Sequence, residues 1–334
     1  MTVSDISSLT PAAPAKASPL LLLSRYGTFA AFIALLIFNM AVTPHFLSWQ
    51  TLNVNLTQVA TIVIVATGMT LVIATGGIDL SVGSLMAISG ALAPMIFMGT
   101  LFPIDNAPLA VALAFVIPVI VASLFGWFNG FLVTKFSIQP IVATLVLFIA
   151  GRGIAQVMTN GNLQVFKNPP FQFIAMGHVF GIPAQVALMI VIAALTYALI
   201  RYTVIGRQII AVGGNEKAAR LTGIPVKRVK IVVYMVSGAL AGIAGLVVVA
   251  RNSSSDANLV GMGMELDAIA AVAVGGSLLT GGRANIIGTL LGALVIQLVR
   301  YTLLANGVPD AAALIVKAAL IVIAVFIQSR ADKS

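Results

Sequence analysis

The chain has 334 residues, of which 60% are apolar and only 8% are charged, and its mean hydropathy is +1.10. A soluble protein of this composition would expose far too much apolar surface, so the sequence predicts an all-α polytopic membrane protein. The net charge of +9 then reports membrane topology rather than nucleic-acid binding, and the lack of cysteine excludes disulfides and thiolate metal sites.

The first 20 residues are rich in Ser, Pro and Ala, and we expect them to form an unstructured cytoplasmic tail. Residues 21–330 are expected to form a single transmembrane domain without a cleaved signal, because the apolar stretch beside Arg25 is long enough to span. The apolar runs predict about ten spans. We place them at 27–43, 57–75, 82–98, 108–132, 138–158, 184–200, 231–250, 266–281, 284–304 and 310–328.

The basic residues indicate how these spans are oriented. With the N-terminus inside, the outer segments hold only Lys167 and Arg251, whereas the inner segment 201–230 alone holds seven of the eighteen basic residues. The positive-inside rule then places both termini in the cytoplasm and favours an even number of spans. Five spans precede the long outer loop at 159–183 and five follow it, which predicts two halves of inverted topology.

The first polar interruption of interest is TGGIDLSVGS at 75–84. An ionisable residue such as Asp79 at the end of a span is costly unless it faces a cavity, a partner or the interface. One interpretation is a tight turn in which Asp79 or Ser81 caps the next helix. The other is a helix break that lines a translocation path, for which the candidate residues are Gly76, Gly77, Asp79, Ser81, Ser84 and Asn129.

The longest polar interruption is 206–230. Within it, Asn215 is suited to cap a helix, Glu216 follows at the positive end of that helix, and Gly223 before Pro225 is a stop signal. The pattern predicts a helix of about two turns, from Glu216 to Thr222, which needs docking to be stable. The chemistry alone leaves two interpretations open, a capped surface helix or a helix that binds a partner protein.

The stretch ELDAIAAVAVGGSLLTGGR at 265–283 has two acids at the outer mouth of a span, followed by two glycine pairs. This pattern predicts close packing and a broken or re-entrant segment. Interfacial acids and small-residue packing explain it without substrate contact. Arg152 lies within a predicted span, where snorkelling or pairing with Asp267 or Asp310 is the ordinary explanation.

The sequence lacks the residue patterns that ATP hydrolysis, metal binding, covalent catalysis and proton coupling require. The sequence has no GxxxxGK[ST] phosphate loop, and His45 and His178 form no cluster with nearby acids that could hold a metal. No nucleophile and base are arranged for covalent catalysis, and no ladder of buried acids supports proton coupling. We therefore expect a transport subunit that is not an enzyme and needs no cofactor.

Four stretches carry a resemblance to a known family: GMTLVIATGGIDLSVGS at 68–84, IQPIVATLVLFIAGRG at 138–153, AVGGNEKAARLTGI at 211–224 and ELDAIAAVAVGGSLLTGGRANIIGTLLGA at 265–293. In this order, and over essentially all of 20–328, the chain resembles the permease subunits of bacterial sugar ABC importers. The similar branch is that of ribose, galactose and galactofuranose, with the galactofuranose permeases nearest.

The resemblance implies a type II ABC importer-like permease in the bacterial inner membrane. Two permease chains, identical or paralogous, would form the pathway for a monosaccharide such as galactofuranose or ribose. Two separate cytoplasmic ATPase subunits would drive it, and a periplasmic binding protein would deliver the sugar. The outer loops at 44–56, 159–183 and 251–265 would meet this protein, with candidate salt-bridge partners Lys167, Arg251, Asp256 and Glu265.

The coupling helix of the family, which docks on the ATPase, corresponds to 215–224 here. The residues implied in ATPase coupling are Gly214, Asn215, Glu216, Ala218, Ala219, Arg220, Leu221, Gly223 and Ile224. Other classes remain as alternatives, namely a branched-chain amino-acid ABC permease, a secondary ion-coupled transporter and a structural membrane scaffold.

Overall fold

The computed structural model describes residues 19–309, 311–316, 318–319 and 322. The tail expected at 1–20 and the span expected at 310–328 lie largely outside these residues. The helices that it defines are α1 (Pro19–Val42), α2 (Trp49–Ala74), α3 (Val82–Phe97), α4 (Ala107–Lys135), α5 (Pro140–Met158), α6 (Pro169–Met176), α7 (Ala184–Tyr202), α8 (Val204–Gly214), α9 (Glu216–Leu221), α10 (Val226–Asn252), α11 (Met264–Val274) and α12 (Ile286–Ala305).

Within the described part of the chain, six helices are long and apolar enough to cross a membrane: α2, α4, α5, α7, α10 and α12. Gly27–Val42 of α1, together with α3 and α8, forms shorter apolar helices. This bears out a helical, multi-pass protein. The number of about ten spans and the inverted halves stay predictions.

Helices α2, α3 and α10 form the centre of the bundle. Every residue of α2 from Val59 to Ala74 is buried, and so is every residue of α3 from Val82 to Pro94. Small residues let the backbones approach closely, as membrane helices require. A Cβ atom added at Gly126 of α4 would lie 2.2 Å from the carbonyl oxygen of Tyr234 in α10, so the two helices touch along this line.

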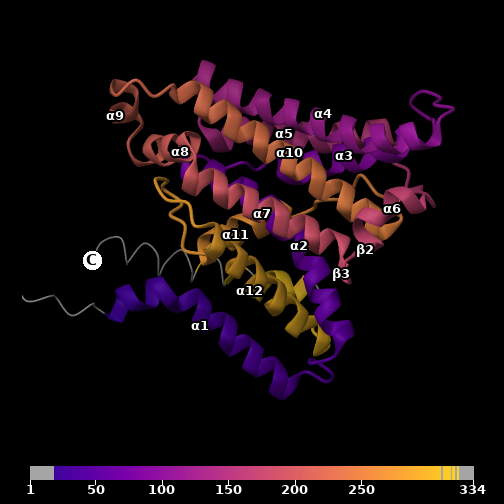
Figure 1. Cartoon of the computed structure of the whole chain (residues 1–334), viewed down its shortest axis with the longest axis horizontal. Helices are drawn as coiled ribbons and strands as arrows, with labels where there is room; N and C mark the ends of the chain where they lie inside the picture. Colours follow the sequence, from indigo (N-terminus) through magenta and orange to yellow (C-terminus); the bar gives the residue numbers. More distant parts are fainter. Residues whose placement is uncertain (1–18, 310, 317, 320–321, 323–334) are drawn as a thin grey trace, which may run out of the picture.

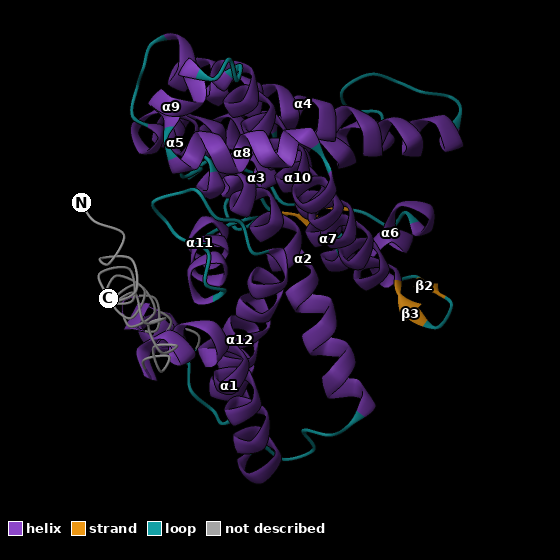
Figure 2. Cartoon of the chain, turned by 60° about the vertical axis from the view of Figure 1, so that its left-hand side comes forward, coloured by secondary structure: helices purple, strands orange, loops and turns teal. Residues whose placement is uncertain are grey.

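Two groups of connecting segments lie at opposite ends of the long axis of the bundle (Figure 1). Figure 1 shows α9 at one end and α6 with the hairpin of β2 (His178–Val179) and β3 (Ile182–Pro183) at the other. Figure 2, turned by 60°, shows the same separation. The basic segment expected inside and the long loop expected outside therefore lie at opposite ends.

The boundaries of α2 and α11 differ from the predicted spans for reasons that the structure shows. Helix α2 begins at Trp49, eight residues before the predicted span, because Ser48 caps it and its polar first turns pair with α12, where Gln297 donates to Gln58 at 2.7 Å. Helix α11 ends at Val274 rather than at 281. Its 11 residues extend about 16 Å, roughly half of a bilayer core, which confirms the broken segment expected there.

Candidate functional site

Helix α9 has the capped geometry that the sequence predicts, one residue shorter. The Asn215 side chain accepts a hydrogen bond from the amide of Ala218 at 3.0 Å. The backbone of Gly223 has φ of +83°, a left-handed conformation that glycine adopts without strain and that ends the helix. The helix is therefore defined by local signals at both ends.

The inner face of α9 is held against the body of the protein. Ala219 is buried in an apolar cluster with Val226 and Val229, and Ile224 packs against the same cluster. The Glu216 carboxylate accepts hydrogen bonds from Lys230 at 2.6 Å and from Arg220 at 3.0 Å. These contacts supply the docking that so short a helix needs.

The face of α9 that points away from the rest of the protein is exposed. The Leu221 side chain is 90% exposed at the end of the helix, although it is apolar. Of the residues expected to couple to an ATPase, Ala219 faces the body, Glu216 and Ile224 are partly buried, and the exposed ones are Gly214, Asn215, Ala218, Arg220, Leu221 and Gly223. The exposed Leu221 and Arg220 at the end of the helix form a surface that a partner protein could cover.

Acidification is expected to loosen α9. The hydrogen bond from Lys230 lowers the pKa of Glu216 from its ordinary 4.5, so the ion pairs stabilise the helix above about pH 4.5 and are lost as the pH falls further. Because the Glu216 side chain is 41% exposed, we expect these ion pairs to stabilise the docked helix by less than about 1 kcal/mol. The protection factors of the α9 amides, which compare the intrinsic with the observed exchange rate at each pH, should fall below that pH, and in Glu216→Gln this fall should disappear. A Lys217→Gln control, changed at an exposed side chain, should retain it.

A buried polar network surrounds the break between α2 and α3, which is the loop at 75–81. The carboxylate of Asp79, which is fully buried, accepts from the amide of Ser81 at 3.0 Å, the hydroxyl of Ser81 at 2.6 Å and the hydroxyl of Ser237 in α10 at 2.9 Å. Asn129 of α4 donates to the Ser81 hydroxyl at 2.9 Å. Ser237 lies about 16 Å along α10 from Val226, so the network sits deep in the bundle.

Helix α5 joins the same break. The Ser84 hydroxyl donates to the carbonyl of Leu147 at 2.8 Å, and the amide of Leu80 donates to the Thr144 hydroxyl at 3.1 Å. Four helices, α3, α4, α5 and α10, are thus hydrogen-bonded around one loop. This arrangement gives the unwound backbone the partners that it needs inside a membrane protein.

The geometry of the break is that of a capped turn. Asp79 satisfies the amide of Ser81, whereas Ser81 itself forms no side-chain cap on α3. Of the residues expected beside a path, Gly76 is exposed, and those that the bundle buries are Gly77, Asp79, Ser81, Ser84 and Asn129. Contact between these residues and a solute remains a prediction.

A junction of three backbones links α8 to this break. The amide of Gly282 donates to the carbonyl of Ala74 at 3.0 Å, and a Cβ atom added at Gly213 of α8 would lie 1.8 Å from that same carbonyl oxygen. A Cβ at Gly281 would lie 2.8 Å from the amide of Gly76. The paired glycines in the sequence signalled close packing, but they did not identify these partners.

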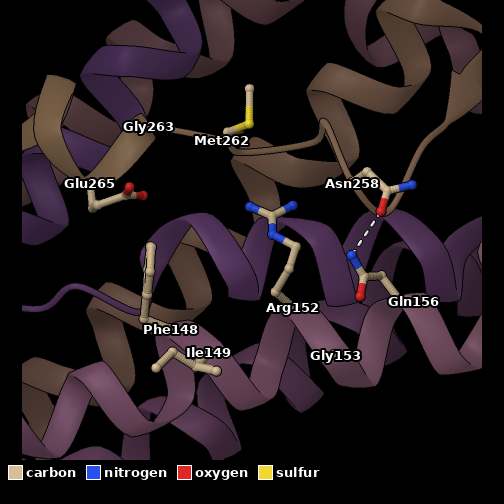
Figure 3. Close-up of a pocket in the computed structure, with 9 residues that line it drawn as sticks. All are labelled: Phe148, Ile149, Arg152, Gly153, Gln156, Asn258, Met262, Gly263 and Glu265. Carbon is tan, nitrogen blue, oxygen red and sulfur yellow. Dashed lines mark hydrogen bonds between the residues drawn. The ribbon is translucent and has the colours of Figure 1, made fainter.

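A second candidate site is a cavity of about 530 Å³ between α5 and the segment 256–263 (Figure 3). The Arg152 guanidinium donates to the carbonyls of Ala257 at 2.8 Å and Val260 at 2.6 Å. Gln156 donates to Asn258 at 2.7 Å. These two hydrogen bonds of Arg152 go to backbone carbonyls of the segment 256–263, which are acceptors that the sequence did not predict.

Two of the loops expected outside meet through a short strand pair, in which β1 (Gln164–Val165) runs antiparallel to β4 (Ser254–Ser255). Lys167 beside it is exposed and Asp256 is partly buried. Arg251 instead donates to the carbonyl of Thr57 at 3.1 Å. Glu265 is only 6% exposed, at the start of α11. Of these four residues, Lys167 is thus exposed, Arg251 and Asp256 are partly buried and Glu265 is buried.

Comparison with known proteins places these features in a family. Residues 52–325 match the family described as "Branched-chain amino acid transport system / permease component". The chain is 37% identical over 316 residues to the galactofuranose transporter permease protein YtfT of Escherichia coli (strain K12), covering 90% of this chain and 88% of that protein.

Two further relatives are permeases. The chain is 40% identical over 304 residues to the ribose import permease protein RbsC of Escherichia coli (strain K12), covering 90% of this chain and 92% of that protein. It is 39% identical over 295 residues to the fructose import permease protein FruF of Bifidobacterium longum (strain NCC 2705), covering 84% of this chain and 81% of that protein. No solved structure shows significant similarity to the chain.

Proposed function

The chain belongs to the family of branched-chain amino acid transport system permease components, and from this membership we propose that it is the transmembrane subunit of an ATP-driven sugar importer. One observation carries the choice of solute. Three relatives that match over most of both chains are named as permeases for galactofuranose, ribose and fructose. The proposed solute is accordingly a monosaccharide such as galactofuranose or ribose, delivered by a periplasmic binding protein.

The energy for uptake comes, in this proposal, from ATPase subunits on separate cytoplasmic chains. The exposed apolar tip of α9 and its basic surround support a docking role for this helix. The chain lies in the inner membrane with both termini in the cytoplasm. A second permease chain, identical or paralogous, completes the pathway.

Movement of α9 reaches the centre of the bundle by two routes. One is α10, whose Lys230 holds Glu216 and whose Ser237 holds Asp79. The other is α8, which ends in backbone contact with α2 at Gly213. The buried network makes the helices around the break move as one unit, which is how ATPase closure rocks one bundle against the other. The residues at 76–84 and Asn129 brace the helices beside the path.

The route through α8 can be tested by replacing each of two adjacent glycines, Gly213 and Gly214, with alanine. Alanine at Gly213 would place its Cβ 1.8 Å from a backbone oxygen, so α8 must shift away from α2. We expect Gly213→Ala to reduce uptake at least about ten-fold, equivalent to about 1.4 kcal/mol. Gly214→Ala is the matched control for packing, because nothing lies within 4 Å of its Cβ position and alanine keeps the exposed backbone through which Gly214 is implied in coupling. Equal uptake by the two variants, measured at matched membrane expression, would remove this junction from the mechanism.

The proposed function is tested by reconstitution. The chain is placed in proteoliposomes with its ATPase and binding protein, and uptake of labelled ribose, galactose, galactofuranose and leucine is measured with and without ATP. We expect uptake of one of the sugars that requires both ATP and the binding protein. Uptake of leucine alone would identify an amino-acid permease, and uptake without ATP would indicate a secondary transporter.

A further inference from the structure

A basic pocket at the inner end of α7 takes no part in the transport mechanism described above. This cavity of about 710 Å³ lies between the last turns of α7, α8 and the loop before α12. Arg201, Arg207 and Arg283 line it, and all three are exposed. Both salt bridges found in the described part of the chain belong to Glu216, so no carboxylate within it neutralises these guanidinium groups.

The pocket is continuous with an exposed stripe along α7. Residues at 190, 194, 197 and 201 recur at helical spacing on one face and are all exposed, in the order Ile, Ala, Tyr and Arg. The Tyr197 ring lines the pocket and packs edge-on against Tyr202 with 6.3 Å between centroids. Tyrosine rings of this kind sit at the boundary of lipid and water. The stripe therefore leads from an apolar surface through an aromatic boundary to the arginines.

The loop side of the pocket adds positive potential. The 20-residue helix α12 begins there, with Ile286 in the lining, and Asn285 as its cap. The partial positive charge of a helix N-terminus favours an anion in the same space as the guanidinium groups. Planar guanidinium groups bind phosphate oxygens in pairs, which a lysine cannot do.

From this arrangement we propose that the pocket binds the phosphate headgroup of an anionic phospholipid of the inner leaflet, with an acyl chain along the α7 stripe. The proposal rests on the membrane orientation proposed above. A free phosphate ion would use the arginines but not the apolar stripe, and an acidic protein surface would need neither the concave shape nor the aromatic boundary. The combination therefore selects a lipid.

The position of the pocket also suggests what the lipid does. Ala211 and Gly282 line it, and both lie next to the contact of Gly213 with α2. A bound headgroup thus bridges α8 and the loop before α12 at the junction that connects α9 to the bundle. Such a lipid stabilises the inner end of α8 against the rest of the protein.

Lipid binding is measured by native mass spectrometry of the purified full chain titrated with phosphatidylglycerol or phosphatidylcholine. We expect phosphatidylglycerol to bind at least about ten-fold more tightly, and this preference to be lost in a triple variant with glutamine at the pocket arginines, Arg201→Gln, Arg207→Gln and Arg283→Gln. A matched triple variant with the same change of charge outside the pocket should keep the preference. Its substitutions are at exposed side chains, Lys217→Gln, Lys227→Gln and Arg228→Gln.

Three results would overturn the proposal. The pocket variant could retain the lipid preference, or both triple variants could lose it equally, which would mean that net charge alone attracts the lipid. Inorganic phosphate could displace phosphatidylglycerol at equal molar concentration, which would identify a free-anion site. The single variant Arg207→Gln should show an intermediate loss in the folded protein. None of these measurements involves transport, so their failure is distinguishable from failure of the sugar-import proposal.

Discussion

Replacement of Leu221 with aspartate is expected to reduce sugar uptake to background while the membrane domain still folds. The side chain is 90% exposed and lies at the end of α9, so its loss removes little contact within the chain. An apolar side chain buried at the centre of a docking surface contributes about 2 kcal/mol or more, and a carboxylate in its place loses this contact and must be desolvated. We expect binding of the ATPase to weaken at least about thirty-fold, measured by co-purification together with uptake.

The control for this variant keeps the apolar volume. Leu221→Met should retain most of the uptake, because methionine fills a hydrophobic pocket of similar size. The thermal unfolding of the purified permease should be alike in both variants. Normal uptake by Leu221→Asp would show that the tip of α9 is not part of the coupling surface.

Replacement of Asp79 with leucine is expected to have the second large effect, through stability rather than docking. Leucine leaves the amide of Ser81 and the hydroxyls of Ser81 and Ser237 without their acceptor in a buried site. Each unsatisfied buried group costs about 1–3 kcal/mol, so we expect a loss of roughly 3–5 kcal/mol after the hydroxyls reorient. The yield of folded protein and the melting temperature should both fall.

Asparagine at Asp79 is the informative comparison. Its carbonyl oxygen accepts the two hydrogen bonds from Ser81, and its amide donates to the Ser237 hydroxyl, so the network keeps its connections. We expect Asp79→Asn to retain much more uptake than Asp79→Leu. Equal uptake by the two variants would contradict a role based on hydrogen bonding.

Local signals made part of this structure predictable from the sequence. The cap at Asn215 and the stop at Gly223 act within a few residues, so α9 appears one residue from its predicted end. The break near Asp79 was predictable because a glycine pair and an acid interrupt an apolar run. Its two interpretations differ only in what surrounds the carboxylate, which no local pattern encodes.

Other features depend on contacts that are distant in sequence. Arg152 donates hydrogen bonds to the backbone carbonyls of residues 257 and 260. Every residue has a backbone carbonyl, so the sequence does not indicate which ones bind Arg152. The inward orientation of Arg251 and the burial of Glu265 likewise follow from the packing of α10 and α11 on their neighbours. Loop charges that appeared available to a binding protein are therefore only partly so.

The polar first turns of α2 show the same limit. Hydropathy excluded them from the predicted span, yet Gln58 is hydrogen-bonded to Gln297 of α12 and the helix continues outward to Trp49. A polar stretch that finds partners on a neighbouring helix is indistinguishable in sequence from a loop. The shorter α11 has a comparable cause, since the backbone of Gly275 abuts Gly288 and the chain turns there.

Coupling through α9 can be tested directly because the chain contains no cysteine, so Leu221→Cys introduces a single thiol. The measurement is labelling of this thiol by a membrane-impermeant maleimide in oriented vesicles, with and without the bound ATPase. The account predicts labelling from the cytoplasmic side only and protection when the ATPase is bound. Labelling from the outer side, or equal labelling in the presence and absence of the ATPase, would contradict it.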